Sequence, residues 1–589
     1  MELNFLKSII YVLGAGSMFL GFLFYKKNDK KEPLISWIVI DLLLVGCFQC
    51  FAAGVFDLVH IPVGLISIAI VDALASGYFW FAIKKSKSRQ NYEYKWLDTV
   101  FLAVVAVIII YICHSRYDGL ALNLRYMTID PVNHFRVAMD VLNGGTVASM
   151  YYEGVWNAMF IGVFAPLTTV DYYYKIFVVS ELTNLALSAG IIYALVRKCT
   201  NNRFNRVAAI VISGLYMVGY PLCSMMYGFV YLGMGLTLIG LIAVLTEVFV
   251  NDEMPKWLGI IALMLSCNGI FECYVMFMPI VFFAVISCIF LKQFKNKKLI
   301  SKDTIVTCLA VFLLPCIFGF IFTYLPIFMQ ETTVSNAIAN EGANYKDLYS
   351  NFVPFLPFAI IGYIQIVKNR KNRLMLFLAP YSVIFTLILF VKAIRGSVST
   401  YYYYKMYFLL WLVAFVLVFY CMEFVAREGR KIIGSCFAVY MIIMVAMISC
   451  AETKIANKCP GLITTNKASS YTDIFATNYF NLKYDHLINR NDKMELYHWV
   501  YDFVEETGEF VPMAGGWEDD LWFQDVTNQR YYGWGQSDPD HTDYFNHLND
   551  SEAKYVLVLL DSQIYLDNTE YFDSLDVIYE TWIGKVVKL

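Results

Sequence analysis

The sequence predicts a mainly α-helical membrane protein, a polytopic transmembrane helical bundle of about 14 spans with a C-terminal extracytoplasmic α/β domain. Of its 589 residues, 59% have apolar side chains and 16% are charged, and the mean hydropathy is +0.56. This composition excludes an ordinary soluble protein. Apolar runs of about 18 residues recur along the first three quarters of the chain. The remaining polar segment, roughly 135 residues long, can bury a core of its own.

The predicted spans divide the chain into a transmembrane domain, 1–450, and an outer domain, 451–589. Each span is taken as about 14 to 24 residues of mostly apolar sequence. The fourteen spans begin near residues 7, 34, 61, 97, 174, 207, 229, 257, 272, 304, 353, 374, 405 and 432.

Lysine and arginine in alternate loops set the orientation of the spans. Seven alternate loops, "KKNDKK" and "KQFKNKKLISK" among them, together hold 26 of the 45 Lys and Arg residues, and cytoplasmic loops carry this kind of excess. Placing them in the cytoplasm puts both termini outside it. The assignment requires that the apolar stretch 151–170 does not cross the membrane, and we expect it to form a helix along the outer surface.

The first outer loop, 114–170, contains the polar stretch "TIDPVNHFRVAMD". Asp130 before a proline, followed later by "NGG", predicts a short helix that begins at the aspartate. His134 lies four residues on and therefore close to the same helix face. Asp130 is either a simple helix cap or a reactive carboxylate, and Asp140 and Arg125 add further charge to the same loop.

Cations recur on the outer side at the start of a later span, in "VKAIRGSVSTYYYYKMYF". The positive-inside rule disfavours Lys392, Arg395 and Lys405 there, so they indicate an anionic partner such as a phosphate. Tyr404 and its neighbours could contact a sugar ring through their aromatic faces. The alternative is that Lys405 extends to the membrane interface and that the tyrosines form an aromatic belt.

Two acids lie in the outer parts of predicted spans, Glu181 and Glu272. A carboxylate inside the membrane costs roughly 2.5 kcal/mol or more unless it faces a polar environment. Two such acids at a similar depth predict a polar cavity, although each could instead make a hydrogen-bonded contact between helices.

The outer domain has the patterns of strands and turns. "YVLVLLD" at 555–561 predicts a buried strand, and "VIYETWIGKVVKL" predicts a closing hairpin. Between residues 513 and 541, tryptophans alternate with acids and glycines. That composition suits carbohydrate binding, or a solvated loop with buried tryptophans.

Taken together, "DPVNHFRVAMDVLNGG" and "SVSTYYYYKMYF" resemble motifs of the GT-C superfamily of membrane glycosyltransferases. The resemblance implies a polyprenyl-phosphate-linked sugar as donor, undecaprenyl in bacteria, a cell-envelope glycan as acceptor, inversion at the anomeric carbon and a multi-pass protein of the bacterial cell membrane. Within this scheme Asp130 is the expected general base. The expected roles of the other residues are catalysis for His134, donor-phosphate binding for Lys405, Arg395 and Lys392, and lining of the substrate cavity for Tyr404, Glu272, Glu181, Asp140 and Arg125.

The first outer loop contains no DxD pair, so the sequence assigns no metal ligands and no cofactor other than the donor itself. Expected partners are the lipid bilayer, the lipid-linked donor and the glycan acceptor, and nothing in the sequence indicates a nucleic acid. Two other functions share the same features. A polysaccharide polymerase or ligase would also use a lipid-linked substrate at the outer face, and a flippase for lipid-linked glycans would line a path across the bilayer with charge.

Overall fold

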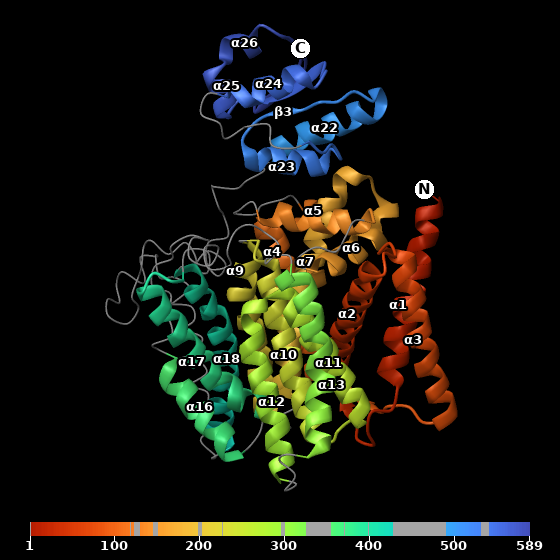
Figure 1. Cartoon of the computed structure of the whole chain (residues 1–589), viewed down its shortest axis with the longest axis vertical. Coiled ribbons are helices and arrows are strands. Elements are labelled where there is room, and N and C mark those ends of the chain that lie inside the picture. The colour runs from red at the N-terminus through yellow and green to blue at the C-terminus, as the bar shows by residue number, and fades with distance from the viewer. Residues whose placement is uncertain are drawn as a thin grey trace.

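The computed structural model describes residues 2–117, 119–122, 130–144, 151–197, 203–226, 228–295, 301–325, 355–369, 372–398, 400–427, 491–531 and 541–589. A bundle of long helices carries the α/β domain at one end, and the N-terminus lies at that same end (Figure 1). The predicted fold class is therefore confirmed.

The helices of the bundle follow the order of the predicted spans. They are α1 (Glu2–Phe24), α2 (Leu34–Leu58), α3 (Leu65–Ser86), α4 (Trp96–Arg116), α5 (Asp130–Leu142), α6 (Tyr151–Phe164), α7 (Tyr173–Arg197), α8 (Arg203–Val218), α9 (Tyr220–Met226), α10 (Val230–Val250), α11 (Lys256–Cys273), α12 (Met278–Lys295), α13 (Lys302–Gly319), α16 (Leu356–Asn369), α17 (Arg373–Ile394) and α18 (Thr400–Arg427).

Thirteen of the fourteen predicted spans coincide with helices of the bundle. In the part of the chain that the structure describes, eleven helical segments are long and apolar enough to cross a membrane. Two helices at predicted spans, α8 and α16, are shorter, and the span predicted at residue 432 lies outside the described residues. The structure therefore confirms a polytopic helical protein, whereas the described residues do not reproduce the predicted number of fourteen spans.

Burial separates the helices into a centre and a rim. The span in α10 is 89% buried, although almost every one of its residues is apolar. The spans in α3 and α4 are mostly exposed, with Leu74, Phe81, Val107 and Ile110 among their accessible side chains. A helix that is apolar all round belongs in a core or in lipid, so α10 forms the core and the rim faces the membrane.

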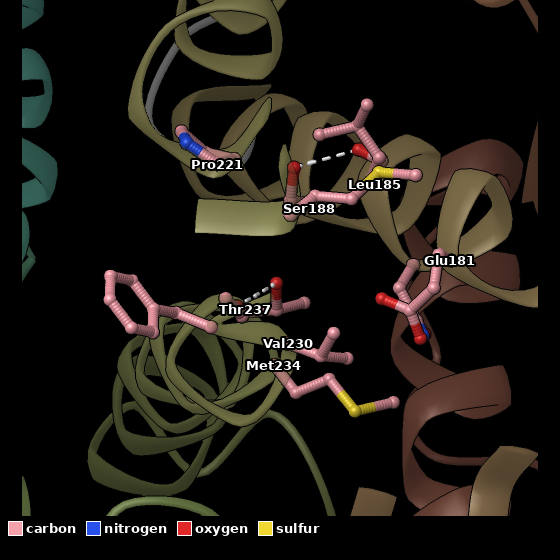
Figure 2. Close-up of a pocket in the computed structure, with 11 residues that line it drawn as sticks. Glu181, Leu185, Ser188, Pro221, Val230, Met234 and Thr237 are labelled. Carbon is pink, nitrogen blue, oxygen red and sulfur yellow. Dashed lines mark hydrogen bonds between the residues drawn. The ribbon is translucent and has the colours of Figure 1, made fainter. Parts of the chain in front are cut away.

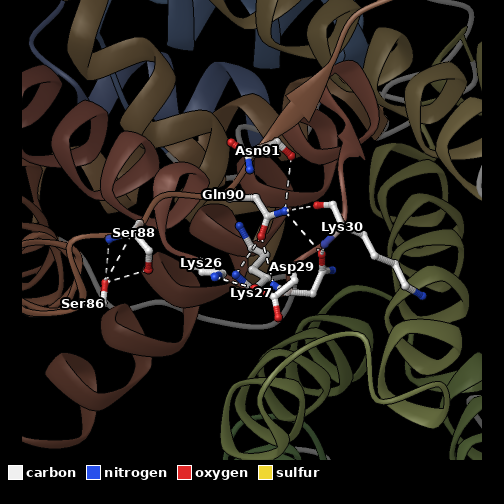
Figure 3. Close-up of polar contacts among 9 residues, drawn as sticks. Lys26, Lys27, Asp29, Lys30, Ser86, Ser88, Gln90 and Asn91 are labelled. Atoms are coloured by element: carbon white, nitrogen blue, oxygen red, sulfur yellow. Dashed lines mark hydrogen bonds and ion pairs between the residues drawn. The ribbon is translucent and has the colours of Figure 1, made fainter.

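Two lysine-rich loops, 26–31 and 84–95, lie at the end of the bundle away from the α/β domain (Figure 1). Gln90 joins two of these loops, because its side-chain oxygen accepts from the backbone N–H of Lys27 at 2.8 Å and its amide donates to the Lys30 carbonyl at 2.8 Å (Figure 3). The same pairing continues as the two-stranded parallel ladder of β1 (Glu32–Pro33) and β2 (Tyr92–Glu93). These contacts hold two basic loops that are distant in sequence side by side.

Helices α5 and α6 lie between the long helices and the α/β domain (Figure 1). At 14 residues, α6 is about 21 Å long, which is too short to cross a hydrocarbon core of about 30 Å. The expectation of a surface helix is wrong in one respect, because α6 packs against α2, α5, α7 and α11. Its Tyr152 is buried against Gly46 and Gly269, where missing side chains leave the space.

The C-terminal domain is built on a four-stranded mixed sheet in the order β3-β4-β6-β5. Strand β3 is parallel to β4, and the remaining pairs are antiparallel. The predicted strand and hairpin are both present. The elements are α22 (Asn491–Thr507), β3 (Met513–Ala514), α23 (Trp517–Val526), α24 (Thr542–Asp550), β4 (Tyr555–Leu559), α25 (Gln563–Asp567), α26 (Thr569–Asp573), β5 (Asp576–Glu580) and β6 (Gly584–Lys588).

Strand β4 is apolar throughout because both of its faces are covered. Leu557 and Leu559 join the hydrophobic core that includes α22 and α23, while Val556 and Val558 join a second core that includes α24 and α26. Alternation of side chains along a strand produces this division.

The domain docks on α5 and on the short turn Val170–Tyr172 that precedes α7, through charged and aromatic contacts. The Nε atom of Arg136 lies 3.2 Å from each carboxylate oxygen of Asp525, and the rings of Phe135 and Trp522 stack at 6.1 Å. At the second contact, His498 Nδ1 lies 2.6 Å from an oxygen of Asp171. The tryptophan- and acid-rich segment of the domain therefore includes part of its interface with the bundle.

Candidate functional site

Asp130 is the first residue of α5, as the sequence predicts. Helix α5 is held in place by its apolar face, on which Val132, Phe135 and Met139 are buried. The Asp130 carboxylate is half-buried, and among the described residues no hydrogen bond or ion pair engages it. Within the described ranges, the side chain of Asp130 therefore makes no capping bond to its own helix.

A glycine brings the loop between α9 and α10 against the start of α5. Gly228 has a φ of +77°, a conformation that side chains other than glycine rarely adopt. A Cβ atom at this position would lie 2.3 Å from Cδ of Pro131 and 2.7 Å from Cβ of Asp130. Only glycine therefore lets this backbone pass beneath Asp130.

His134 and Glu153 form a buried pair behind Asp130. The His134 Nδ1 atom lies 3.1 Å from Oε1 of Glu153, and the two side chains are only 4% and 1% exposed. The two atoms do not meet hydrogen-bond geometry, so charge attraction at this distance holds the pair more than a linear hydrogen bond does. The ring of His134 also lies 5.2 Å from that of Tyr231.

Lys405 is buried near the start of α18 and surrounded by aromatic rings. Its Nζ atom lies 2.8 Å from the centre of the Phe229 ring, 4.7 Å from that of Tyr401 and 5.9 Å from that of Tyr231. Aromatic faces stabilise a desolvated ammonium group. The alternative that Lys405 extends to the membrane interface is not what the structure shows, because the residue is only 1% exposed.

The charges of these residues act on one another. Burial raises the pKa of Asp130 above its ordinary value, and the charges of His134 and Lys405 partly offset that effect. Burial alone would lower the pKa of His134, but Glu153, Asp130 and the backbone of Gly228 raise it above its ordinary value. Asp130, His134, Glu153 and Lys405 thus form one electrostatic group, called here the Asp130 cluster.

A small hollow lies next to the Asp130 cluster, between α7, α9 and α10. Phe229, which contacts Lys405, lines one part of it, and Glu181 lines another. Figure 2 shows Glu181 among largely apolar neighbours. The hydroxyls of Ser188 and Thr237 bond to carbonyls of their own helices, so Glu181 and Asn184 supply most of the polarity.

The two intramembrane acids do not share this hollow. Glu181 accepts from the amide of Asn157 at 3.2 Å and interacts electrostatically with Glu153, which connects it to the Asp130 cluster. Glu272 is buried in α11 and interacts electrostatically with Cys50 and Cys273. It is not among the lining residues, so the prediction of one cavity for both acids differs from the structure.

The remaining residues of the predicted site are dispersed. Lys392 and Arg395 are exposed at the end of α17, and within the described ranges no ion pair joins them to the Asp130 cluster. Tyr404 packs against Tyr403 with ring centres 5.0 Å apart. Arg125 and the outer segment predicted at 326–352 lie outside the described residues.

Asp140 has a different role from the predicted one. It forms an ion pair with Arg530 of the C-terminal domain, and both side chains are partly exposed. Asp140 therefore contributes to domain docking and does not face the hollow. For metals, the described part of the chain contains no cluster of three or more His, Cys, Asp or Glu side chains arranged as ligands.

Glu153 and Gly228 are the functional candidates that the sequence did not reveal. A signal for Glu153 was present, because it is a single acid in the apolar stretch "YYEGVWNAMF" and is costly to bury without a partner. For Gly228 there was no comparable signal, because its contact with α5 depends on the folded chain.

The fold and this site define a class of polytopic membrane protein. Its helical bundle carries an α/β domain at one end, and a buried cluster of acidic and basic side chains lies at that same end. Comparison of the sequence with protein-family models and with curated proteins found no match. Two solved structures are similar to this chain, ArnT from Cupriavidus metallidurans in the apo state and the same protein bound to undecaprenyl phosphate. Their TM-scores are 0.44 and 0.41, each at 12% identity over 83% of this chain and 97% of the ArnT chain.

Proposed function

We propose that this protein is an integral-membrane glycosyltransferase that transfers a sugar from a polyprenyl-phosphate-linked donor to a cell-envelope glycan on the outer face. The observation that carries the proposal is the electrostatic interaction between Asp130 and Lys405. A half-buried carboxylate without a partner among the described residues lies within electrostatic reach of a fully buried ammonium group. In glycosyl transfer from a phosphate, a base can take the proton of the acceptor hydroxyl and a cation can stabilise the leaving phosphate.

Asp130 serves as the general base. The acceptor hydroxyl oxygen attacks the anomeric carbon, and its proton passes to the Asp130 carboxylate. The new glycosidic C–O bond forms as the bond between the anomeric carbon and the donor phosphate oxygen breaks. The electron pair of that bond remains on the phosphate, which leaves as polyprenyl phosphate. Inversion follows from this single displacement.

Lys405 stabilises the charge that develops on the leaving phosphate. Its ammonium group already lies in a dry, aromatic environment, where a charge interaction is stronger than in water. Phe229 and Tyr401 hold the side chain in position before the donor binds. The lysine therefore needs little rearrangement during the reaction.

The position of the Asp130 cluster suits a substrate that is part lipid and part sugar. Helix α5, which carries Asp130 and His134, lies at the end of the bundle next to the α/β domain (Figure 1). The lipid chain can remain among the exposed apolar side chains of the bundle while the sugar reaches α5. The sequence resemblance to the GT-C superfamily supports the same substrate class.

Reconstitution into vesicles tests the proposal. Vesicles that contain the full chain are supplied with a radiolabelled polyprenyl-phosphate sugar and a cell-envelope glycan fraction, and the label in the glycan is measured. We expect single sugars to move to the glycan, with free polyprenyl phosphate as the other product. The Lys405→Met variant is expected to lose this transfer.

Two other outcomes identify the alternatives. Transfer of whole oligosaccharides from a lipid-linked donor, with no transfer of single sugars, indicates a polymerase or ligase. Movement of the intact lipid-linked sugar between leaflets without glycosylation indicates a flippase. Either result would overturn the proposed transferase.

A further inference from the structure

We infer that Glu153 is a positioning residue that keeps His134 positively charged, and that the charged His134 keeps Asp130 ionised when the donor phosphate occupies Lys405. This inference rests on the proposed function and extends it to a residue that does not touch the substrates. The geometry that carries it is the buried contact at 3.1 Å between His134 and Glu153, one helical turn from Asp130.

The number of charges in the Asp130 cluster shows why a second cation is needed. In the free enzyme Asp130 and Glu153 are balanced by His134 and Lys405. A donor phosphate adds negative charge beside Lys405, which then no longer compensates Asp130. A buried carboxylate next to an uncompensated anion tends to take up a proton, and a protonated Asp130 cannot accept one from the acceptor. His134 is the remaining cation within one helical turn.

Neutral imidazole would not supply that charge, and two contacts favour the charged form. A neutral histidine ring has one nitrogen that donates and one that accepts. In this site Nδ1 lies 3.1 Å from the Glu153 carboxylate, and the backbone of Gly228 acts on the ring in the same direction. Because both neighbours favour positive charge on the ring, a ring with protons on both nitrogens fits best.

The groups around His134 come from four elements. Asp130 lies on its own helix, Glu153 is on α6, Tyr231 is on α10, and Gly228 belongs to the loop that precedes α10. Glu181 on α7 acts on Glu153, and Lys405 on α18 acts on Asp130. Glu153→Gln removes the negative charge that lies 3.1 Å from His134 and keeps the shape of the side chain.

Nuclear magnetic resonance of the full chain in lipid nanodiscs tests the charge directly and without any substrate. Histidines are labelled with ¹⁵N, and the His134 signal is identified by its loss in His134→Gln, one of seven histidines in the chain. We expect both ring nitrogens to be protonated at pH 7 in the parent and one to be unprotonated in Glu153→Gln. A neutral His134 in the parent, or an unchanged signal in the variant, would overturn the inference.

The pH dependence of sugar transfer tests the consequence for Asp130. In Glu153→Gln we expect the acidic limb of kcat/KM to move up by about one to three pH units, the range that a lost neighbouring charge produces. Glu153→Asp retains the charge and should keep the limb near that of the parent. If Glu153 had only a structural role, its replacement would lower the stability of the protein and leave the acidic limb of kcat/KM at the same pH.

Failure of the inference differs from failure of the proposed function. If the parent transfers sugar and Glu153→Gln has the parent's pH profile, the role of Glu153 is wrong and the transferase stands. If the parent transfers no sugar while the His134 signal responds as expected, the charge relation stands and its catalytic purpose is wrong.

Discussion

The Arg136 guanidinium of α5 contacts the Asp525 carboxylate of the C-terminal domain with its Nε atom 3.2 Å from both oxygens. Arg136 follows His134 by two residues, so the helix that carries the candidate base is also the helix that holds the domain. Burial raises the pKa of Asp525 to about 6, while Arg136 and Arg530 act in the opposite direction. The contact therefore joins domain docking to the geometry of the site.

Removing Arg136 should loosen the domain. Arg136→Ala leaves Asp525 buried without its main partner, and loss of one member of a buried pair costs about 3 kcal/mol. We expect faster hydrogen exchange in α5 and α23, measured by mass spectrometry. Lys554→Ala is the matched control, because Lys554 pairs with Glu509 at an exposed site and should change little. Equal exchange in both variants would contradict the docking role.

Replacing Lys405 should reduce catalysis more than stability. Lys405→Met keeps an unbranched apolar side chain in the aromatic site and removes the charge, so the fold should persist. We expect kcat to fall by about 10² to 10³, as when one stabilising group is lost from a transition state. Lys392→Met is the control, because Lys392 is exposed and has no contact with the Asp130 cluster among the described residues. Comparable losses in both variants would remove Lys405 from its proposed role.

A side chain at Gly228 should displace the start of α5. Gly228→Ala carries the cost of a left-handed backbone, about 1 to 2 kcal/mol, and adds the clash with Pro131 and Asp130. Gly144→Ala isolates the first effect, because Gly144 has a φ of +80° and nothing within 4 Å of the added Cβ. Gly228→Ala should have a lower melting temperature and a lower rate of sugar transfer than Gly144→Ala. Identical behaviour would mean that the close approach has no importance.

His134 should make stability depend on pH. Because its pKa in the folded protein is raised, the stability it contributes is fully present below its ordinary value of about 6.5. That contribution is lost as the pH rises through the raised pKa. The melting temperature of the parent relative to His134→Gln should therefore be higher at pH 6 than at pH 9. A difference in melting temperature between the parent and His134→Gln that grows toward alkaline pH would contradict this prediction.

Local patterns in the sequence were sufficient to predict the helices and strands and part of the candidate site. The spans follow from apolar length, and the strand and hairpin of the C-terminal domain follow from alternation and turn residues. The proximity of Asp130 and His134 follows from their spacing, because four residues turn a helix by only about 40° beyond a full turn. Asp140 is ten residues from Asp130 and points about 80° away around the same axis, which explains why it meets Arg530 instead of the hollow.

Contacts between distant segments could not be predicted in this way. The partner of His134 is nineteen residues away on another helix, and Phe229 and Lys405 are separated by much of the chain. Glu272 shows the same limit, because its place near the end of α11 follows from the sequence while the direction in which it faces does not. Depth depends on hydropathy along the chain, whereas direction depends on how the helices pack.

The most direct test of the central claim is sugar transfer by Asp130→Asn in vesicles, compared with the parent and with Asp140→Asn. Asparagine keeps the shape of aspartate and cannot accept the proton, so we predict a loss of about 10² to 10⁴ in rate with an unchanged melting temperature. Asp140→Asn removes a carboxylate from the same helix and should retain most of the transfer. Full transfer by a folded Asp130→Asn would contradict the role of Asp130 as the base.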